Sequence, residues 1–211
     1  MARHGILART AVLDAQIKAF LEKTPDAVVL NLGAGLDTRG YRLGGGAARW
    51  YDVDLPPVAA LRKKALMQND KTEVVAASVL DSAWLDGIKY ASPDRVLIVA
   101  EGLVRYFAQC DVKRIVEMLA DKFPGAQMLF DVVHHFFVNK KIGSEFLWGV
   151  SGAQDIEALS PRIKLREAWR TGDLLLARQP LLLRLMNILP GTRGRSWILH
   201  IGFERGGVTA P

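Results

Sequence analysis

Two glycines and a carboxylate are spaced as they would be around a bound nucleotide. Residues 28–32 form an apolar run of strand length that leads into Gly33 and Gly35. Asp54 ends a second predicted strand about twenty residues later. A glycine has no Cβ, so the main chain can bend sharply there and lie against a ligand. A carboxylate at the end of the second strand suits the two hydroxyls of a ribose, so the spacing predicts a nucleotide-sized pocket at the edge of a parallel sheet.

The turn after the first strand favours a cofactor that has no phosphate at this position. A dinucleotide site has a third glycine and a helix N-terminus directed at the pyrophosphate. Here Thr38 takes the place of that glycine, and Asp37 puts a carboxylate in the turn, where it would repel a pyrophosphate. S-adenosylmethionine has no such conflict. Asp54 suits the ribose of either cofactor, so an NAD-dependent oxidoreductase remains an alternative.

Four segments resemble the leucine carboxyl methyltransferase family, which includes the tetracenomycin-type polyketide O-methyltransferases. They are LGAGLDTR at 32–39, DVDLP at 52–56, ART at 8–10 and AEGLVRYF at 100–107. The resemblance implies an α/β fold of the Rossmann-like class I methyltransferase type. Such a fold has a mostly parallel seven-stranded sheet with helices on both faces. The implied cofactor is S-adenosyl-L-methionine.

The resemblance assigns seven residues to cofactor binding: Arg9, Gly33, Gly35, Asp54, Ser78, Val79 and Glu101. Arg9 would bind the methionine carboxylate, which a guanidinium can hold with two parallel hydrogen bonds. Glu101 would meet the methionine ammonium group, and Asp54 the ribose hydroxyls. Ser78 and Val79 would hold the adenine, although the family usually has an aspartate at position 78. A neutral hydroxyl binds the adenine amino group more weakly than a carboxylate does.

Each assignment has an ordinary structural alternative. Arg9 could be a surface arginine, Asp54 could cap the following helix, and Ser78 could belong to a plain loop. Glu101 could form an ion pair with Arg105 or with Arg9 in the absence of a ligand. Asp52 points to the same side of its strand as Asp54 and is expected to be either a supporting partner or a solvated group.

Three residues just past the fourth and fifth predicted strands could face the transferable methyl group: Tyr106, His134 and His135. Either histidine could take a proton from a hydroxyl acceptor, but the sequence does not identify the base and assigns no catalytic residue. No third ligand follows the histidine pair at a suitable spacing, so we expect no metal. Other apolar residues could line an acceptor pocket or belong to the core: Trp148, Trp169 and residues 181–185.

Together with these residues, the resemblance implies an O-methyltransferase that acts on a carboxylate or hydroxyl of a small molecule. A truncated or non-catalytic cofactor-binding member of the same fold is the main alternative. Eight residues precede Arg9, whereas the family has a longer, lysine-bearing cover there, and the segment after the fifth strand also looks short. A second copy of the chain could supply such a cover, so a homo-oligomer is an open expectation.

The bulk properties are those of a globular protein. The chain has 211 residues and a net charge of +6, and we expect one domain over 1–211 with a short N-terminal helix. The excess charge falls in residues 161–211, where the arginines are spaced rather than clustered, which argues against a nucleic-acid partner. The lone Cys110 forms no internal disulfide and suits a cytoplasmic location. The sequence has no run of about 18 uncharged apolar residues, so we expect no membrane span.

Alternating periodicities predict the order of the elements. Strands are expected at 27–32, 49–53, 73–77, 95–100, 127–133, 163–169 and 197–204. Helices are expected at 7–23, 56–68, 111–122 and 174–189, with a helical turn at 81–89 and mixed structure at 136–159. Asp111 is the expected cap of the third of these helices. Strands that alternate with helices favour a mostly parallel sheet.

Overall fold

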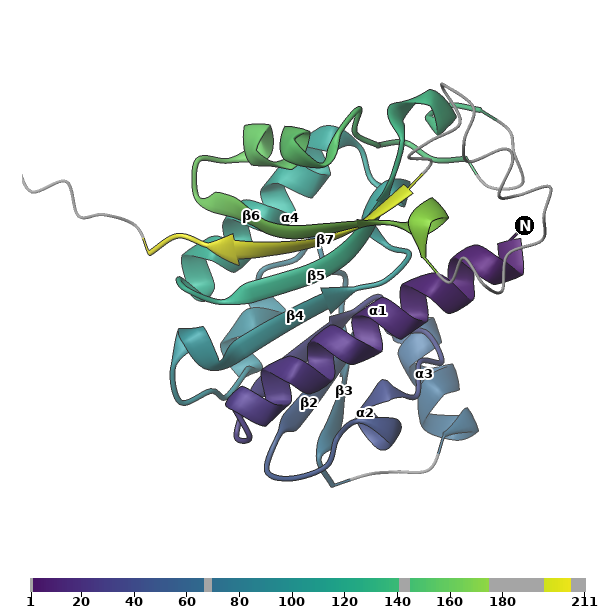
Figure 1. Ribbon diagram of the computed structural model, residues 1–211. Helices are drawn as coiled ribbons and strands as arrows, with labels where there is room; N and C mark the ends of the chain where they lie inside the picture. Colours follow the sequence, from purple (N-terminus) through teal and green to yellow (C-terminus); the bar gives the residue numbers. More distant parts are fainter. Residues whose placement is uncertain (1, 67–69, 141–144, 175–195, 206–211) are drawn as a thin grey trace, which may run out of the picture.

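Seven strands form one sheet in the order β3-β2-β1-β4-β5-β7-β6 (Figure 1). The computed structural model describes residues 2–66, 70–140, 145–174 and 196–205. The strands are β1 (Val28–Leu32), β2 (Arg49–Asp54), β3 (Thr72–Ala76), β4 (Val96–Ala100), β5 (Gln127–Val133), β6 (Ile163–Arg170) and β7 (Ser196–Phe203).

The sheet is parallel except at one strand. The pairs among β1 to β5 are all parallel, whereas β7 runs antiparallel to both β5 and β6. Every residue of β1 and β4 is buried, as expected for parallel strands that are covered on both faces. The prediction of a mostly parallel α/β sheet is therefore correct, with one reversed strand near its edge.

Helices cover both faces of the sheet. They are α1 (Ala2–Lys23), α2 (Arg39–Arg42), α3 (Pro56–Ala65) and α4 (Gln109–Lys122). Figure 1 shows α1 crossing one face of the sheet and α4 lying behind the other. On the α1 side, Leu13 and Ile17 pack in a cluster with the sheet residue Val29. On the α4 side, Ile115 and Leu119 pack in a second cluster.

Short 3-10 turns pack beside α4 on its face of the sheet. The turns η1 (Ala83–Gly87) and η5 (Ala153–Leu159) contribute Leu85 and Ile156 to the cluster on that face. The segment expected to be mixed and partly helical at 136–159 contains most of η4 (His135–Phe137) and all of η5, and isolated bridges pair His134 with Val150 and Val138 with Phe146.

Two predicted helix starts are wrong. α1 begins at Ala2 rather than at residue 7. α4 begins at Gln109 with Ala108 as its N-cap, so Asp111 lies inside the first turn and does not cap the helix. A carboxylate in the first turn stabilises a helix by interacting with its dipole. An aspartate near the start of a helical pattern can therefore lie inside the first turn as well as at the cap.

Some predictions fall outside the described residues. These are most of the helix expected at 174–189, the apolar run at 181–185 and much of the basic segment after residue 175. Within the described part of that segment, Arg162 pairs with Asp121, and Arg205 pairs with Asp94 at 3.3 Å.

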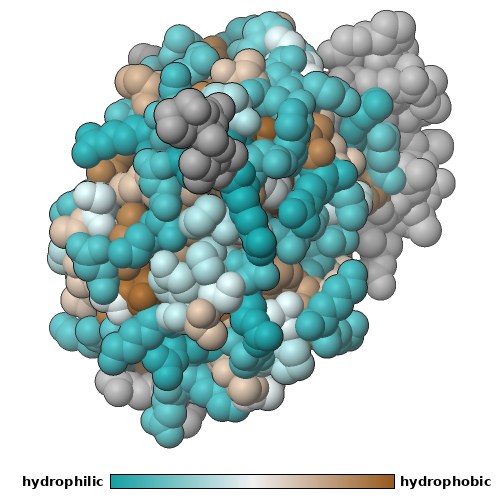
Figure 2. Space-filling model, turned by 90° about the vertical axis from the view of Figure 1, so that its left-hand side faces the viewer, coloured by the Kyte–Doolittle hydropathy of each residue, from teal (hydrophilic) through white to brown (hydrophobic). Residues whose placement is uncertain are grey.

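The edge where the parallel strands begin is mainly hydrophilic. Figure 2 views the molecule from this side, and apolar residues are scattered among polar ones over most of the visible surface. The other edge, where these strands end, carries the glycine turn and the ionisable groups singled out in the sequence. Within the described ranges, no helix has the length and apolar character needed to cross a bilayer.

Candidate cofactor site

The turn after β1 depends on glycine at position 33. Gly33 has a φ of +64°, a conformation that L residues rarely adopt. A Cβ at this position would lie 2.8 Å from Cδ1 of Leu103, in the loop after β4. The Gly33 amide donates to the Val53 carbonyl at 2.8 Å, so the turn is tied to the neighbouring strand β2. Gly35 also has positive φ, at +48°, but a Cβ there would face open space.

Asp54, at the end of β2, holds the same turn through its side chain. Its Oδ2 accepts a hydrogen bond from the Gly35 amide at 2.7 Å, and Oδ1 accepts one from the Leu55 amide at 2.8 Å. The N-cap of α3 is Leu55, with no side-chain cap, so the interpretation of Asp54 as a helix cap is wrong. The half-buried Asp54 carboxylate therefore lies against the turn at the open edge of the sheet.

A buried ion pair stabilises the glycine turn. Asp52 and Arg62 pair with both side chains fully buried, so the alternative of a solvated Asp52 is wrong. Arg62 Nη1 also donates to the Gly35 carbonyl at 2.9 Å. Asn31 Nδ2 donates to Asp52 Oδ1 at 2.9 Å and to Asp37 Oδ2 at 3.2 Å. Burial raises the pKa of Asp52, and the charge of Arg62 opposes that shift.

A cavity of about 350 Å³ opens beside this turn. Three of the predicted cofactor residues line it together: Arg9, Gly33 and Glu101. The remaining lining residues come from α1, β1 and the segment after β1: Thr10, Asn31, Ala34, Leu36, Asp37, Thr38, Arg39 and Arg42. The structure thus joins α1, the glycine turn and the loop after β4, three segments that are far apart in the sequence.

Arg9 and Glu101 form an ion pair in the cavity. Arg9 Nε lies 2.6 Å from Glu101 Oε1, and Arg9 Nη1 lies 3.0 Å from Asp131 Oδ2. The expectation of a Glu101–Arg9 pair in the absence of ligand is confirmed, and the described partner of Arg105 is Asp131. Asp131, in the second half of β5, also accepts a hydrogen bond from the Gly102 amide at 2.5 Å. Burial lowers the pKa of Arg105 to about 10, with a further contribution from the charge of Arg9, so Arg105 stays charged at neutral pH.

Arg39 is a buried residue that contacts Glu101, and the sequence pattern did not identify it as part of the site. Its side chain is 3% exposed and contacts three carboxylates: Nε meets Asp14 at 2.6 Å, and Nη1 meets Asp37 at 2.8 Å and Glu101 at 2.5 Å. Burial alone would lower the pKa of Arg39, but the charges of Glu101 and Asp37 raise it well above its ordinary value. In the sequence Arg39 lies two residues after Asp37, and this local pattern does not indicate its contacts with α1 and with the loop after β4.

Ser78 and Val79 follow β3 on the same edge of the sheet. Ser78 Oγ accepts a hydrogen bond from the Leu80 amide at 3.3 Å, and Val79 is buried in the core on the α4 face. Neither residue lines the cavity next to Arg9. In the strand order of the sheet, their position is two strands away from the Gly33 turn.

The residues expected near a methyl acceptor lie past β4 and β5. Tyr106 is exposed and packs against Phe146 with the ring centroids 5.7 Å apart. His134 Nδ1 accepts a hydrogen bond from the Phe136 amide at 3.1 Å, and burial together with His135 lowers the pKa of His134. His135 Nδ1 lies 3.0 Å from Ser151 Oγ.

The two tryptophans considered for an acceptor pocket pack with the core. Trp148 is buried in the cluster on the α4 face, and Trp169 packs against the cluster on the α1 face. Across the ranges that the structure describes, no group of three or more histidine, cysteine or acidic side chains could hold a metal ion.

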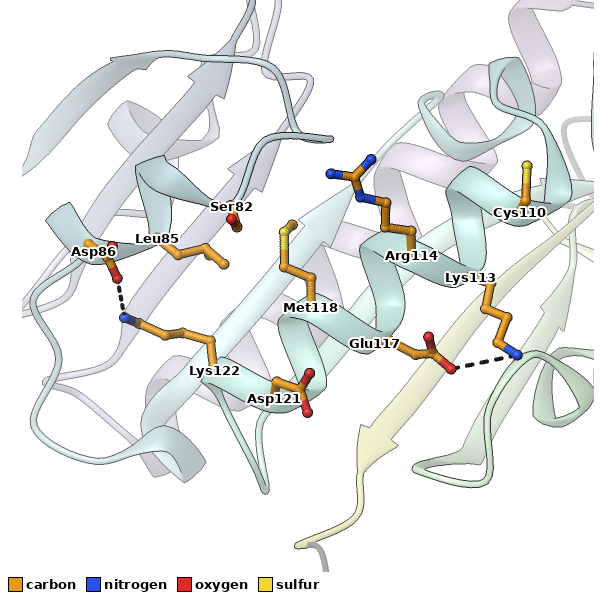
Figure 3. A pocket seen from close by; sticks show the side chains of 10 residues that line it. All are labelled: Ser82, Leu85, Asp86, Cys110, Lys113, Arg114, Glu117, Met118, Asp121 and Lys122. Atoms are coloured by element: carbon orange, nitrogen blue, oxygen red, sulfur yellow. Dashed lines mark hydrogen bonds and ion pairs between the residues drawn. The ribbon is translucent and has the colours of Figure 1, made fainter.

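A larger cavity lies away from these residues, between η1 and the outer side of α4 (Figure 3). Its volume is about 650 Å³, and it contains the exposed Cys110. Two ion pairs form among its charged side chains: Lys122 lies 2.8 Å from Asp86, and Lys113 lies 3.7 Å from Glu117. We place the candidate site in the smaller cavity because only that one unites the glycine turn with unlike charges from separate elements.

This strand order and the glycine turn at the ends of β1 and β2 define a Rossmann-like methyltransferase fold. Two solved methyltransferase structures resemble the chain over most of its length. N-methyltransferase NodS from Bradyrhizobium japonicum WM9 matches with a TM-score of 0.61 at 12% identity, covering 93% of this chain and 97% of that one. A putative S-adenosylmethionine-dependent methyltransferase from Listeria monocytogenes matches with a TM-score of 0.63 at 11% identity, covering 90% and 96%. At such low identity these similarities establish the fold alone.

The chain belongs to the leucine carboxyl methyltransferase family, whose model matches residues 1–120. The tetracenomycin polyketide synthesis O-methyltransferase TcmP from Streptomyces glaucescens is 31% identical over 174 residues. That alignment covers 78% of this chain and 64% of TcmP, so the chain spans less than two thirds of the length of that relative.

Proposed function

We propose that the protein transfers a methyl group from S-adenosylmethionine to a carboxylate or hydroxyl oxygen of a small molecule. The observation that carries this proposal is the cavity in which Arg9 and Glu101 meet beside the Gly33 turn. The cofactor ends in an amino acid that carries both an ammonium and a carboxylate. A guanidinium and a carboxylate that face each other match those two charges.

The order of the strands supports an extended binding mode. The strands β3, β2, β1 and β4 are consecutive neighbours, so Ser78, Asp54, Gly33 and Glu101 follow one another along the same edge. Three strand spacings of about 4.8 Å span about 14 Å, which accommodates an adenosyl amino acid. In this arrangement Ser78 and Val79 would hold the adenine, Asp54 the ribose and Arg9 with Glu101 the amino-acid end.

Bound S-adenosylmethionine would supply an electrophilic methyl group on a positively charged sulfur. The protein's part is to align the acceptor oxygen with that carbon and to exclude water. A carboxylate acceptor is already anionic and needs no base. A hydroxyl acceptor needs a group that removes its proton as the new bond forms.

The hydrogen bonds of the histidine pair favour His135 as that base. Because His134 Nδ1 accepts from a backbone amide, a neutral His134 carries its proton on Nε2 and presents a donor. His135 differs, because its Nδ1 can donate to Ser151 Oγ and leave Nε2 with a free lone pair. We therefore propose His135 as the base for hydroxyl acceptors.

Calorimetric titration with S-adenosylhomocysteine, the demethylated product, tests the binding step. We expect saturable binding to the wild-type protein and at least about tenfold weaker binding to Asp54→Ala, because each ribose hydroxyl loses a charged acceptor. Asp86→Ala is the matched control, since Asp86 is an exposed carboxylate on η1. Absence of wild-type binding, or equal affinities for Asp54→Ala and Asp86→Ala, would overturn the proposal.

A non-catalytic cofactor-binding protein is the alternative to test next, since the chain spans only 64% of TcmP. Labelled S-adenosylmethionine added to a cell extract with the purified protein would yield a labelled small molecule if the protein is an enzyme. Cofactor binding with no labelled product would favour the non-catalytic alternative. Quenching of tryptophan fluorescence by NADH but not by S-adenosylhomocysteine would favour an oxidoreductase instead.

A further inference from the structure

The ion pair in the cavity is flanked on each side by a second, buried charge. Arg9 contacts Asp131 at 3.0 Å, and Glu101 contacts Arg39 at 2.5 Å. The Asp131 and Arg39 side chains are 2% and 3% exposed, whereas Arg9 and Glu101 are 19% and 16% exposed. Arg9 and Glu101 are therefore the more exposed pair in the cavity, whereas Arg39 lines it with an almost fully buried side chain and the buried Asp131 does not line it.

This arrangement changes the cost of admitting a ligand. A zwitterionic amino-acid group can bind between Arg9 and Glu101 only if these two side chains separate. Separating an isolated, desolvated ion pair leaves both charges uncompensated until the ligand is in place. Here Glu101 keeps Arg39 and Arg9 keeps Asp131 throughout, so neither charge is left without a partner.

We propose that Arg39 is a positioning residue that holds the Glu101 carboxylate at the cavity while a ligand ammonium replaces Arg9 as its other partner. This inference rests on the proposed function, because it assumes that the amino-acid end of the cofactor binds there. Arg39 is suited to the role because Asp14 on α1 and Asp37 in the turn hold its guanidinium from two other directions. A lysine has no planar fork with which to meet three carboxylates at once.

The role predicts an effect confined to ligands that carry the ammonium group. S-adenosylhomocysteine has the adenosyl thioether and the amino-acid group, whereas 5′-methylthioadenosine has only the adenosyl thioether. Arg39 would strengthen binding of the first ligand and leave the second unaffected. A merely structural role, in which Arg39 supports the turn that carries Gly35, would weaken both ligands together.

Calorimetric affinities of both ligands for the wild type, Arg39→Gln and Arg39→Lys separate these roles. We expect Arg39→Gln to weaken S-adenosylhomocysteine at least about tenfold, the size of a lost charge-assisted contact, and to leave 5′-methylthioadenosine within about twofold. Arg39→Lys keeps the charge and should fall between the wild type and Arg39→Gln. Arg95→Gln is the control for loss of a guanidinium, because Arg95 pairs with Asp26 where the parallel strands begin.

A double-mutant cycle with Glu101→Gln keeps the test valid if the Arg39 variants lose some stability. We expect Arg39→Gln to add little to the loss of S-adenosylhomocysteine affinity already caused by Glu101→Gln, since Arg39 acts through that carboxylate. Parallel losses for both ligands, or additive losses in the cycle, would overturn the role of Arg39 and leave the proposed function standing. A wild-type protein that binds neither ligand would instead reject the proposed function and this inference with it.

Discussion

Arg62 on α3 and Asp52 on β2 form an ion pair with both side chains fully buried, and the same guanidinium donates to the Gly35 carbonyl. The pair therefore connects a helix, a strand and the candidate cofactor turn. Its acid is further held by Asn31 on β1. Three charged or polar groups that a hydrophobic core would normally exclude thus fix the position of Gly35.

Arg62→Met should destabilise the protein by about 3–5 kcal/mol, because it leaves the Asp52 carboxylate buried without its counter-charge. Adding Asp52→Asn should recover part of this loss, since the unpaired charge is then absent. Urea unfolding followed by circular dichroism would give both values. Arg95→Met removes an exposed ion pair and should cost less than about 1 kcal/mol. Equal losses for Arg62→Met and Arg95→Met would contradict this prediction.

Gly33→Ala should destabilise the protein more than Gly35→Ala. Both positions have positive φ, which costs an alanine about 1–2 kcal/mol. Only at Gly33 would the new methyl group collide with Leu103, and because the half-buried Leu103 side chain can shift, we expect this to add about 1 kcal/mol, the low end for overpacking. Thermal unfolding of the two variants would measure the difference. Introducing Leu103→Ala beside Gly33→Ala should remove the part of the loss that is due to the collision, and no recovery would show that the collision is not the cause.

The strands could be predicted from the sequence because strands that are buried on both faces are rich in apolar residues. β1, β4 and β5 are mainly apolar runs and β2 mixes apolar with charged residues, and each predicted boundary of these four strands lies within one residue of the observed one. The positions of Gly33 and Asp54 follow from the ends of the first two predicted strands, whereas Glu101 is suggested only by the family resemblance, and the cofactor roles of all three stay predictions. The local pattern did not reveal that α4 starts at Gln109, since helix ends depend on only a few residues.

The partners of the site residues could not be predicted in the same way. Arg62 belongs to the segment LRKKA, which has the composition of a solvated helix face, and only the packing of α3 buries its side chain. A weaker signal was present at Asn31 and Asp131, which are polar residues within apolar strands. A buried polar group needs a partner, so such positions indicate that one exists without showing which residue supplies it.

Ser78→Asp should strengthen binding of S-adenosylhomocysteine by about 1 kcal/mol, because a carboxylate is a stronger acceptor for the adenine amino group than a hydroxyl. The half-buried Ser78 follows β3 on the edge that carries Asp54. Calorimetry would measure the change, with Ser82→Asp as a control for added charge near η1. Unchanged or weaker binding to Ser78→Asp would place the adenine elsewhere.

His135→Ala should lower the rate of methyl transfer to hydroxyl acceptors by about 10²-fold or more, since a general base is lost. Transfer to carboxylate acceptors should change little, because these need no proton removed. Rates with labelled S-adenosylmethionine and acceptors of both kinds would test this, with His134→Ala as the comparison. A rate loss confined to His134→Ala would assign the base to the other histidine.

Acidification should destabilise the fold through His200 on β7. Burial, together with the charge of Arg166, lowers the pKa of His200 from an ordinary 6.5 to about 4. Its ring contacts Gln127 Oε1 through Nε2 at 2.8 Å, while Nδ1 is buried without a partner. The unfolded chain therefore binds a proton between these two pH values that the folded chain does not, and stability falls as the pH drops through this window.

The part of this loss due to His200 should be about 1–2 kcal/mol once partial exposure is taken into account. Urea unfolding at pH 7 and pH 4 would measure it as the difference between the wild type and His200→Gln. The carboxylates of both proteins titrate alike, so their contribution cancels. An identical loss of stability in His200→Gln would show that His200 does not titrate in this way.

The reversed direction of β7 determines where the molecule can be tethered. Because Gly202 lies opposite Gln127 at the start of β5, Phe203 ends its strand on the side remote from Arg9 and Glu101. A linker joined after Glu204 would leave from that remote side. An immobilised protein would then present its cavity to solution, and surface-based titrations would be free of steric hindrance from the support.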